Sequence, residues 1–318
     1  MKDAYVGHRS QLWDVEQVQL LDGKGNGMRL LKVRNGAGLS FDVSADRCAD
    51  ISRVIFKGDN VGYFTACGYV APAFYNPAEF SKSFTAGFIT TCGLEHAGAR
   101  CVENGKEYFQ HGDISNVPCD HIWWEETEDE ILIHGVISNG SLFGSKLRLR
   151  RTIACKKFEN KLTLSDTVEN YGDRDTELML LYHVNLGYPM LSEDMELQIN
   201  SVEVEPTSTR AAEDLATWNK MLAPVPQYAE RCYLHKMQGE GVVKAYNPSI
   251  KKGLEMRFDT AQLPQFTEWK QMGVVDYALG LEPGTCNPGR KRARERGQIL
   301  TIQPGEKKHF QVEFCFFE

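Results

Sequence analysis

The sequence lacks the features that mark membrane, secreted and nucleic-acid-binding proteins. It contains no run of about 18 apolar residues, so we expect no membrane-spanning helix. Residues 1–19 have neither an apolar core nor a cleavage site, so we expect no signal peptide. The formal net charge is −7, which disfavours general attraction to nucleic acid or to an anionic membrane. With 42% hydrophobic and 25% charged residues, the composition is ordinary for a soluble globular protein.

Paired cysteines are also absent. The chain has nine scattered cysteines with no Cys-x-x-Cys motif, which argues against a disulfide framework or a structural zinc site and for a reducing, cytoplasmic compartment. No two histidines have the spacing of helix-borne metal ligands. We therefore expect no metal and no other cofactor, although Glu95 with His96 or His111 could assemble a site in space.

Helix signals are few, whereas strand signals are many. Alternating apolar and polar residues predict strands over 120–126, 130–138, 145–155 and 160–169. Helices are expected mainly at about 77–83 and 209–221, and Thr209 can cap the second. There is no internal repeat and no linker composition. These patterns predict an all-β sandwich or barrel that forms one domain over residues 1–318.

The stretch 277–290 combines a strand pattern with a carboxylate. Its apolar side chains fall on one face, and Ala278, Gly280 and Glu282 fall on the other. Two small residues then leave a trough that a ligand ring could fill, with Glu282 at its end, before Pro283 and Gly284 stop the strand. The alternative interpretation is a surface glutamate before a turn.

A second strand pattern, over 176–189, ends its apolar face in His183 and Asn185. His111 lies next to a glycine in a predicted loop. A lone histidine on such a face is more often a satisfied core residue than a catalyst, so both interpretations stay open at this point.

Three charged segments are further candidates for contact with a ligand. Residues 46–51 place Arg47 and Asp50 in a segment that is either an exposed loop or a ligand-facing one. Trp269 could stack on a ligand ring and Lys270 could bind a hydroxyl or an anionic group; a core tryptophan and a solvated lysine are the alternatives. The basic run 290–296 favours a solvated loop or short helix, but Arg290 could also read a phosphate, sulfonate or carboxylate.

Three short motifs, taken in order, resemble the aldose 1-epimerase (galactose mutarotase) superfamily, and more closely a divergent bacterial branch of it. Residues 110–112, Gln-His-Gly, are similar to the family's Leu-His-Gly. Residues 182–189, Tyr-His-Val-Asn-Leu-Gly-Tyr-Pro, are similar to its His-x-x-Phe-Asn-Leu. Residues 280–283, Gly-Leu-Glu-Pro, are similar to its Cys-Leu-Glu. The resemblance extends from about residue 30 to the C-terminus.

The resemblance implies a large antiparallel β-sandwich with an open groove and a few short helices. It implies His183 as general acid, Glu282 as general base and His111 as a sugar-binding residue. The family's Asn-Arg pair before its first motif is missing here, so Arg47 and Asp50 would take over substrate contacts. Asn185, Trp269, Lys270 and Arg290 complete the expected substrate-binding set.

The chemistry of anomer exchange fits these residues. Opening a hemiacetal needs a base on the anomeric hydroxyl and an acid on the ring oxygen, and a glutamate with a histidine supplies both without a cofactor. We expect the two groups on facing strands, roughly 5–8 Å apart and not bonded to each other. The expected function is interconversion of the anomers of an aldose or a related sugar, with an acidic sugar left open by Arg290.

Two other functions stay open on the sequence. One is a non-catalytic sugar-binding or sensing protein with the same fold, since fold does not fix function. The other is a lyase acting on uronic-acid sugars, for which Tyr182, Arg47 and Arg290 would supply the base and the cations. The sequence does not determine the sugar or the oligomeric state.

Overall fold

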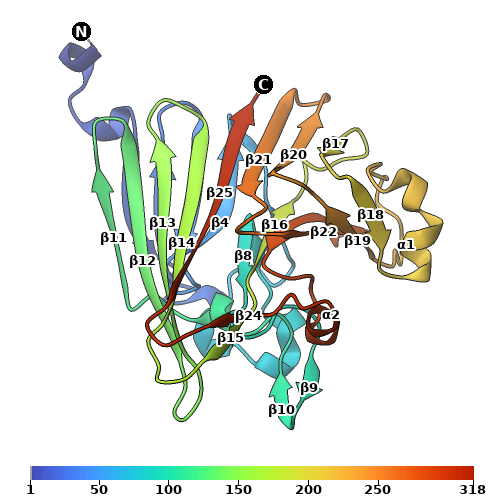
Figure 1. Cartoon of the computed structure of the whole chain (residues 1–318). Helices are drawn as coiled ribbons and strands as arrows, with labels where there is room; N and C mark the ends of the chain where they lie inside the picture. Colours follow the sequence, from blue (N-terminus) through green and yellow to red (C-terminus); the bar gives the residue numbers. More distant parts are fainter. Residues whose placement is uncertain (1) are drawn as a thin grey trace.

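The computed structural model describes residues 2–318 and is built from antiparallel strands (Figure 1). The five-stranded sheet contains, in spatial order, β1 (Asp14–Gln19), β2 (Arg29–Arg34), β3 (Leu39–Ser44), β4 (Asp50–Phe56) and β5 (Asp59–Asn60). The eight-stranded sheet contains β11 (His121–Glu126), β12 (Glu130–Gly140), β13 (Lys146–Lys156), β14 (Lys161–Asn170), β25 (Lys307–Phe317), β21 (Lys252–Asp259), β20 (Glu240–Asn247) and β17 (Glu196–Ile199).

The remaining strands form a six-stranded sheet and three small ribbons. The six-stranded sheet contains β18 (Glu203–Pro206), β19 (Arg231–Lys236), β22 (Gln265–Met272), β23 (Tyr277–Gly284), β16 (Leu181–Leu186) and β8 (Ile89–Cys92). The ribbons pair β6 (Tyr63–Phe64) with β7 (Ala86–Gly87), β9 (Cys101–Glu103) with β10 (Lys106–Tyr108), and β15 (Thr176–Leu178) with β24 (Leu300–Ile302).

The helices are short and lie between strands. The α-helices are α1 (Thr209–Glu213) and α2 (Arg290–Glu295). The 3-10 helices are η1 (Lys2–Tyr5), η2 (Arg9–Gln11), η3 (Gly23–Gly25), η4 (Pro72–Phe74), η5 (Pro77–Lys82), η6 (Ile114–Asn116) and η7 (Leu215–Thr217). None of these described helices is both long and apolar enough to cross a membrane.

The structure confirms the predicted all-β sandwich, and β11 to β14 match the four predicted strands to within a few residues. The predicted helix over 209–221 is shorter than expected, since α1 ends at Glu213. Its cap is Ser208, whose hydroxyl accepts from the Ala211 amide, rather than Thr209. The strand of the 277–290 stretch also continues through Pro283 to Gly284 instead of stopping before them.

Aromatic contacts join the eight-stranded sheet to the other two large sheets. Phe56 of β4 lies 5.8 Å from Phe316 of β25, measured between ring centroids, and Phe258 of β21 stacks on Phe266 of β22 at 5.8 Å. One hydrophobic cluster includes buried side chains from all three sheets. The six-stranded sheet therefore has one face on this core, and its other face is available for a site.

A buried ion network crosses the same core and corrects the expectation for Asp50. Arg151 of β13 donates to Asp50 at 2.6 Å and to Asp166 of β14 at 2.9 and 2.7 Å. Asp166 also accepts from the hydroxyl of Tyr182 of β16. Thr91 of β8 donates to Asp50 through its amide and its hydroxyl. Asp50 therefore helps to join three sheets, because a buried guanidinium needs paired carboxylates.

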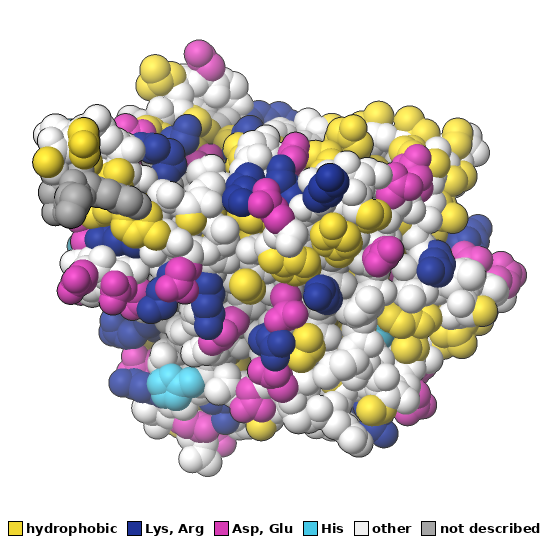
Figure 2. Space-filling model, turned by 90° about the horizontal axis from the view of Figure 1, so that it is seen from above, with side chains coloured by type: hydrophobic (Ala, Val, Ile, Leu, Met, Phe, Trp, Pro, Cys, Tyr) yellow, Lys and Arg dark blue, Asp and Glu magenta, His cyan; other side chains and the backbone are white. Residues whose placement is uncertain are grey.

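The outer surface carries both signs of charge. On the face seen in Figure 2, Lys and Arg side chains alternate with Asp and Glu side chains, without a large region of one sign. This face therefore offers no extended patch of one sign for a charged partner.

Candidate active site

A cleft of about 680 Å³ opens on the face of the six-stranded sheet that points away from the core. Its walls come from the sheet, from β6, from η5 and the segment after it, and from the loops before β19 and around His111. The residues that line it are Tyr63, Thr65, Ala66, Cys67, Phe80, Ser81, Phe84, Gly98, Ala99, Gln110, His111, His183, Tyr228, Glu230, Cys232, Thr267, Trp269, Gln271, Asp276, Glu282 and Pro288.

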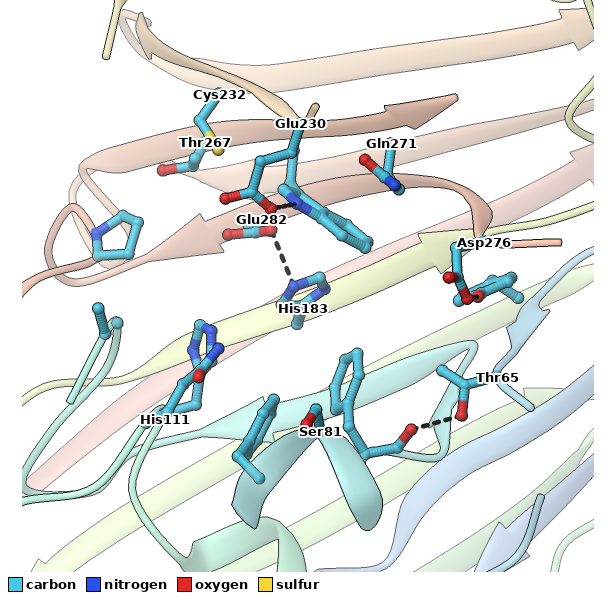
Figure 3. A pocket seen from close by; sticks show the side chains of 18 of the residues that line it. Thr65, Ser81, His111, His183, Glu230, Cys232, Thr267, Gln271, Asp276 and Glu282 are labelled. Atoms are coloured by element: carbon cyan, nitrogen blue, oxygen red, sulfur yellow. Dashed lines mark hydrogen bonds and ion pairs between the residues drawn. The ribbon is translucent and has the colours of Figure 1, made fainter. Parts of the chain in front are cut away.

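His183 and Glu282 form a bonded pair on the floor of this cleft (Figure 3). The Nε2 atom of His183 lies 3.1 Å from Oε1 of Glu282. The expected gap of roughly 5–8 Å is therefore wrong. The reason is the register: β16 pairs directly with β23, with Leu181 opposite Gly284 and Val184 opposite Leu281, which places His183 opposite Glu282.

Gly280 provides the room for this pair. A Cβ atom at this position would lie 2.8 Å from Oε1 of Glu282 and 3.1 Å from both Cε1 of His183 and Cβ of Trp269. The bare strand face that the sequence predicted is real, but it is filled by the protein's own carboxylate, imidazole and indole. Any larger residue at 280 would separate the pair.

Burial shifts the pKa of both groups of the pair, in opposite directions. Burial, with a smaller contribution from the Glu230 charge, raises the pKa of Glu282 to about 8. Burial lowers the pKa of His183 to about 4. Near neutral pH the pair therefore holds one proton, which the short contact lets the two groups share.

Three rings surround the imidazole of His183. The rings of Phe84, His111 and Trp269 lie 5.6, 5.7 and 5.4 Å from it, each with its edge or face at a steep angle. These contacts fix the ring plane, so that Nε2 stays on Glu282 while Nδ1 remains without a hydrogen-bond partner in the protein. A buried imidazole nitrogen without a partner can bind a polar ligand atom.

His111 is positioned by its backbone. Its φ of 58° lies in the left-handed region, and its amide donates to the Gly98 carbonyl while its carbonyl accepts from the Gly93 amide. Burial, followed by the effect of His183, lowers the pKa of His111 to about 3. A neutral imidazole whose Nδ1 atom is also unpartnered can exchange a hydrogen bond with a sugar hydroxyl.

Trp269 lines the cleft beside the pair, and its role as a sugar-stacking residue stays a prediction. Its indole nitrogen donates to Glu230 at 2.7 Å. Lys270, in contrast, points to the opposite face of β22 and donates to the carbonyls of Thr217, Trp218 and Lys220. Alternation along the strand separates the two neighbours, so Lys270 does not reach the cleft.

Three other residues that were predicted to bind the substrate, Arg47, Asn185 and Arg290, also lie outside the cleft. Arg47 is buried and donates to the carbonyls of Val70 and Ser83. Asn185 is buried and donates to the carbonyls of Gly87 and His183.

Arg290 is buried too, where it contacts carboxylates rather than a ligand. It lies between Glu103 and Glu177 and over the ring of Tyr108. Arg290 thus joins α2 to the β9–β10 hairpin, and this residue of the basic run 290–296 stabilises the fold.

Several cleft residues were not singled out from the sequence. Thr267 and Gln271 share a strand face with Trp269, so alternation alone could have found them. Glu230 and Asp276 lie in loops, where no local pattern predicts which side chain turns inward. Nearly all of the cleft's polar groups are neutral or acidic, and among its described lining residues none is Lys or Arg.

No metal-binding arrangement is present among residues 2–318. There, no group of three or more His, Cys, Asp or Glu side chains is placed to hold a metal ion. The unpartnered atoms on the cleft side, such as Oγ1 of Thr267 and Nδ1 of His183, are instead suited to hydrogen bonds with hydroxyl groups.

The chain matches the family described as "Domain of unknown function (DUF4432)" over residues 25–315, and it belongs to that family. A search of curated protein sequences finds no match.

Solved structures share the fold. A protein of Klebsiella pneumoniae proposed to be an aldose 1-epimerase has 24% identity and a TM-score of 0.91, covering 97% of this chain and 86% of its own. A galactose mutarotase-like protein of Clostridium acetobutylicum has 11% identity and a TM-score of 0.72, covering 97% and 99%. The galactose 1-epimerase of Lactobacillus acidophilus has 15% identity and a TM-score of 0.64, covering 96% and 99%. The fold is thus that of the mutarotase-like β-sandwiches.

Proposed function

We propose that this protein is a sugar mutarotase, which interconverts the two anomers of a neutral aldose by opening and closing its ring. The observation that carries the proposal is the bonded pair of His183 and Glu282 on the floor of an aromatic-walled cleft. Such a pair supplies an acid and a base at one point, which ring opening requires.

The pair acts as a unit with one proton. In the reactive form Glu282 is a carboxylate and His183 an imidazolium, which the neutral pair reaches by moving one proton along the 3.1 Å contact. Glu282 takes the proton of the anomeric hydroxyl, the bond between the anomeric carbon and the ring oxygen breaks, and His183 protonates that oxygen. Rotation of the resulting aldehyde and the reverse steps give the other anomer and restore the pair.

Other cleft residues hold the sugar during these steps. The indole of Trp269 offers a flat apolar face for the C–H side of a sugar ring. The unpartnered Nδ1 of His111 and Oγ1 of Thr267 face hydroxyl groups. Positioning of this kind lowers the barrier because the reacting atoms are already aligned.

The charges in the cleft favour a neutral substrate. Glu230, Asp276 and Glu282 line it, with no described lysine or arginine among the lining residues. The expectation of an acidic sugar depended on Arg290 and Lys270, and that of a uronic-acid lyase also on Arg47; all three lie outside the cleft. A uronic-acid lyase loses support for the same reason, and because Tyr182 is buried in the core on Asp166.

Anomer exchange measured by NMR tests the proposal. Freshly dissolved neutral aldoses, each as one anomer, are followed in a weakly catalytic buffer with and without the protein. We expect faster approach to the anomeric equilibrium with at least one aldose, and no acceleration by the Glu282→Gln variant. Binding of a sugar without acceleration by the wild-type protein would instead identify a sugar-binding or sensing protein.

A further inference from the structure

The cleft extends well beyond the His183–Glu282 pair. Thr267, Trp269 and Gln271 are alternate residues on the cleft face of β22, with Thr267 opposite Glu282 and Gln271 opposite Ala278. Alternate strand residues are about 7 Å apart, so Gln271 lies about 13 Å along the sheet from the row of the pair. This length exceeds one sugar ring.

Figure 3 shows how the polar residues divide along this length. Thr267 and His111 lie toward one end of the cleft, His183 lies centrally, and Gln271 and Asp276 lie toward the other end. We call Gln271, Asp276 and Tyr63 the distal subsite. The pair is thus not at the closed end of a cavity made for one ring, but partway along an open one.

The distal subsite carries hydrogen-bonding groups with spare capacity. The Oε1 atom of Gln271 is buried and has no partner in the protein, and its Nε2 atom makes a single long contact of 3.5 Å to the Tyr228 carbonyl. The Tyr63 hydroxyl donates to Asp276 at 3.2 Å. A buried amide oxygen without a partner costs free energy unless a ligand or water satisfies it.

The wall between the pair and the distal subsite is aromatic. Trp269 lies two residues before Gln271 on the same face of β22, and its indole nitrogen donates to Glu230 at 2.7 Å. Tyr63 packs on the small side chain of Ala278 at the far side. An aromatic wall with amide, phenol and carboxylate groups at its end suits a hydroxylated ring that carries no negative charge.

We propose that the distal subsite binds the second, neutral sugar unit of a reducing disaccharide whose reducing-end ring lies at His183 and Glu282. The inference rests on the proposed function and names its substrate class. Hydroxyl groups of the second ring donate to Oε1 of Gln271, to Asp276 and to the oxygen of Tyr63, and accept from the Gln271 amide. A single sugar would reach the pair but leave Oε1 of Gln271 without a partner.

The test compares reducing disaccharides with their own reducing-end monosaccharides. Anomer exchange is measured by NMR for glucose beside cellobiose, maltose and lactose, for wild type and Gln271→Ala. For at least one disaccharide we expect kcat/KM about tenfold above that of glucose. Gln271→Ala should lower the ratio of the two kcat/KM values about tenfold, the loss expected for one or two hydrogen bonds. Gln198→Ala, an exposed glutamine of strand β17, is the matched control and should leave the ratio unchanged.

A binding experiment tests the distal subsite independently of the proposed function. The same sugars are titrated into Glu282→Gln protein, with tryptophan fluorescence as the readout. Tighter binding of a disaccharide than of glucose, lost in the Glu282→Gln, Gln271→Ala double variant, supports the distal subsite even if no sugar is turned over. Equal affinities together with equal kcat/KM values for one and two rings would overturn it, and exchange of monosaccharides alone would leave only the mutarotase proposal.

Discussion

The six-stranded sheet carries two histidine–glutamate pairs, one on each face. On the cleft face, Nε2 of His183 lies 3.1 Å from Glu282, and on the core face, Nε2 of His235 lies 3.3 Å from Glu268. Both pairs join neighbouring strands and both are buried. By contact distance and burial alone, the two pairs could not be told apart.

Their surroundings differ. The Nδ1 atom of His235 contacts the Ser201 hydroxyl at 2.7 Å, and its ring lies against Trp218 and Phe266. The Nδ1 atom of His183 has no partner, and its ring faces a cleft. Each pair has one unpartnered atom, since Oε1 of Glu268 also lacks a partner. Access to the cleft therefore marks the candidate active pair, whereas the pairing itself also serves to stabilise the fold.

Glu282→Gln, which changes the cleft pair, should have the largest effect on activity. The amide keeps the size of the side chain and can still bond to His183, but it cannot exchange a proton with the sugar. We expect the kcat of anomer exchange to fall by at least about a hundredfold, with sugar affinity kept because the loss is in the transition state. Urea unfolding serves as the control, and the free energy of unfolding should not fall. Exchange at the wild-type rate would end the proposed role of the pair.

Glu268→Gln tests the other pair and should act on stability. The variant weakens the bond to His235 inside the core, where an imperfectly paired polar group costs about 1–3 kcal/mol of unfolding free energy. Urea denaturation measures this loss. At temperatures well below unfolding, anomer exchange should stay within about twofold, which is the usual scatter of distant substitutions (about 0.5 kcal/mol). A large loss of kcat in folded protein would contradict the division between the two pairs.

The pH dependence of the cleft pair follows from its single proton. Because the pKa of Glu282 is raised to about 8 and that of His183 is lowered to about 4, the one-proton form dominates between these values. The plot of kcat/KM against pH should be bell-shaped and flat near neutrality. It falls on the acid side as a second proton binds, and on the alkaline side as the last proton leaves. A single limb centred near pH 6 would exclude the shared-proton mechanism.

His111→Asn should have a smaller effect. Asparagine tolerates the left-handed backbone found at this position and retains one hydrogen-bonding group, but it does not reach as far as the imidazole. Loss of one neutral hydrogen bond to the sugar should raise KM about three- to tenfold. Steady-state kinetics separate this from a loss of kcat. An unchanged KM would show that His111 only packs against His183 and Phe80.

The sequence predicted the strands because these depend on local alternation. Short motifs singled out His183 and Glu282 as catalytic candidates and His111 as a sugar-binding candidate. The sequence did not predict that His183 and Glu282 touch, since the register between β16 and β23 joins residues about a hundred positions apart. Residues 46–51 had the charge density of a loop, yet Asp50 belongs to a core network completed by Arg151. The contacts of these side chains depend on residues that are distant in the sequence, and a local pattern carries no information about those residues. The single-domain expectation stays a prediction.

Glu230→Gln should have the smallest effect and isolates the influence of one charge on the cleft pair. The exposed Glu230 is the second cause of the raised pKa of Glu282, after burial. Glutamine still accepts the bond from the Trp269 indole, so the wall of the cleft is retained while the charge is removed.

Removing a negative charge favours the carboxylate form of Glu282, so its pKa falls. The alkaline limb of kcat/KM should therefore move to lower pH by a fraction of a pH unit, with the plateau height kept. Because Glu230 is exposed, salt screens its effect, and added salt should move the wild-type limb toward that of the variant. If the limb does not move in low salt, burial alone sets the proton affinity of Glu282, as it already dominates for Glu268 on the core face.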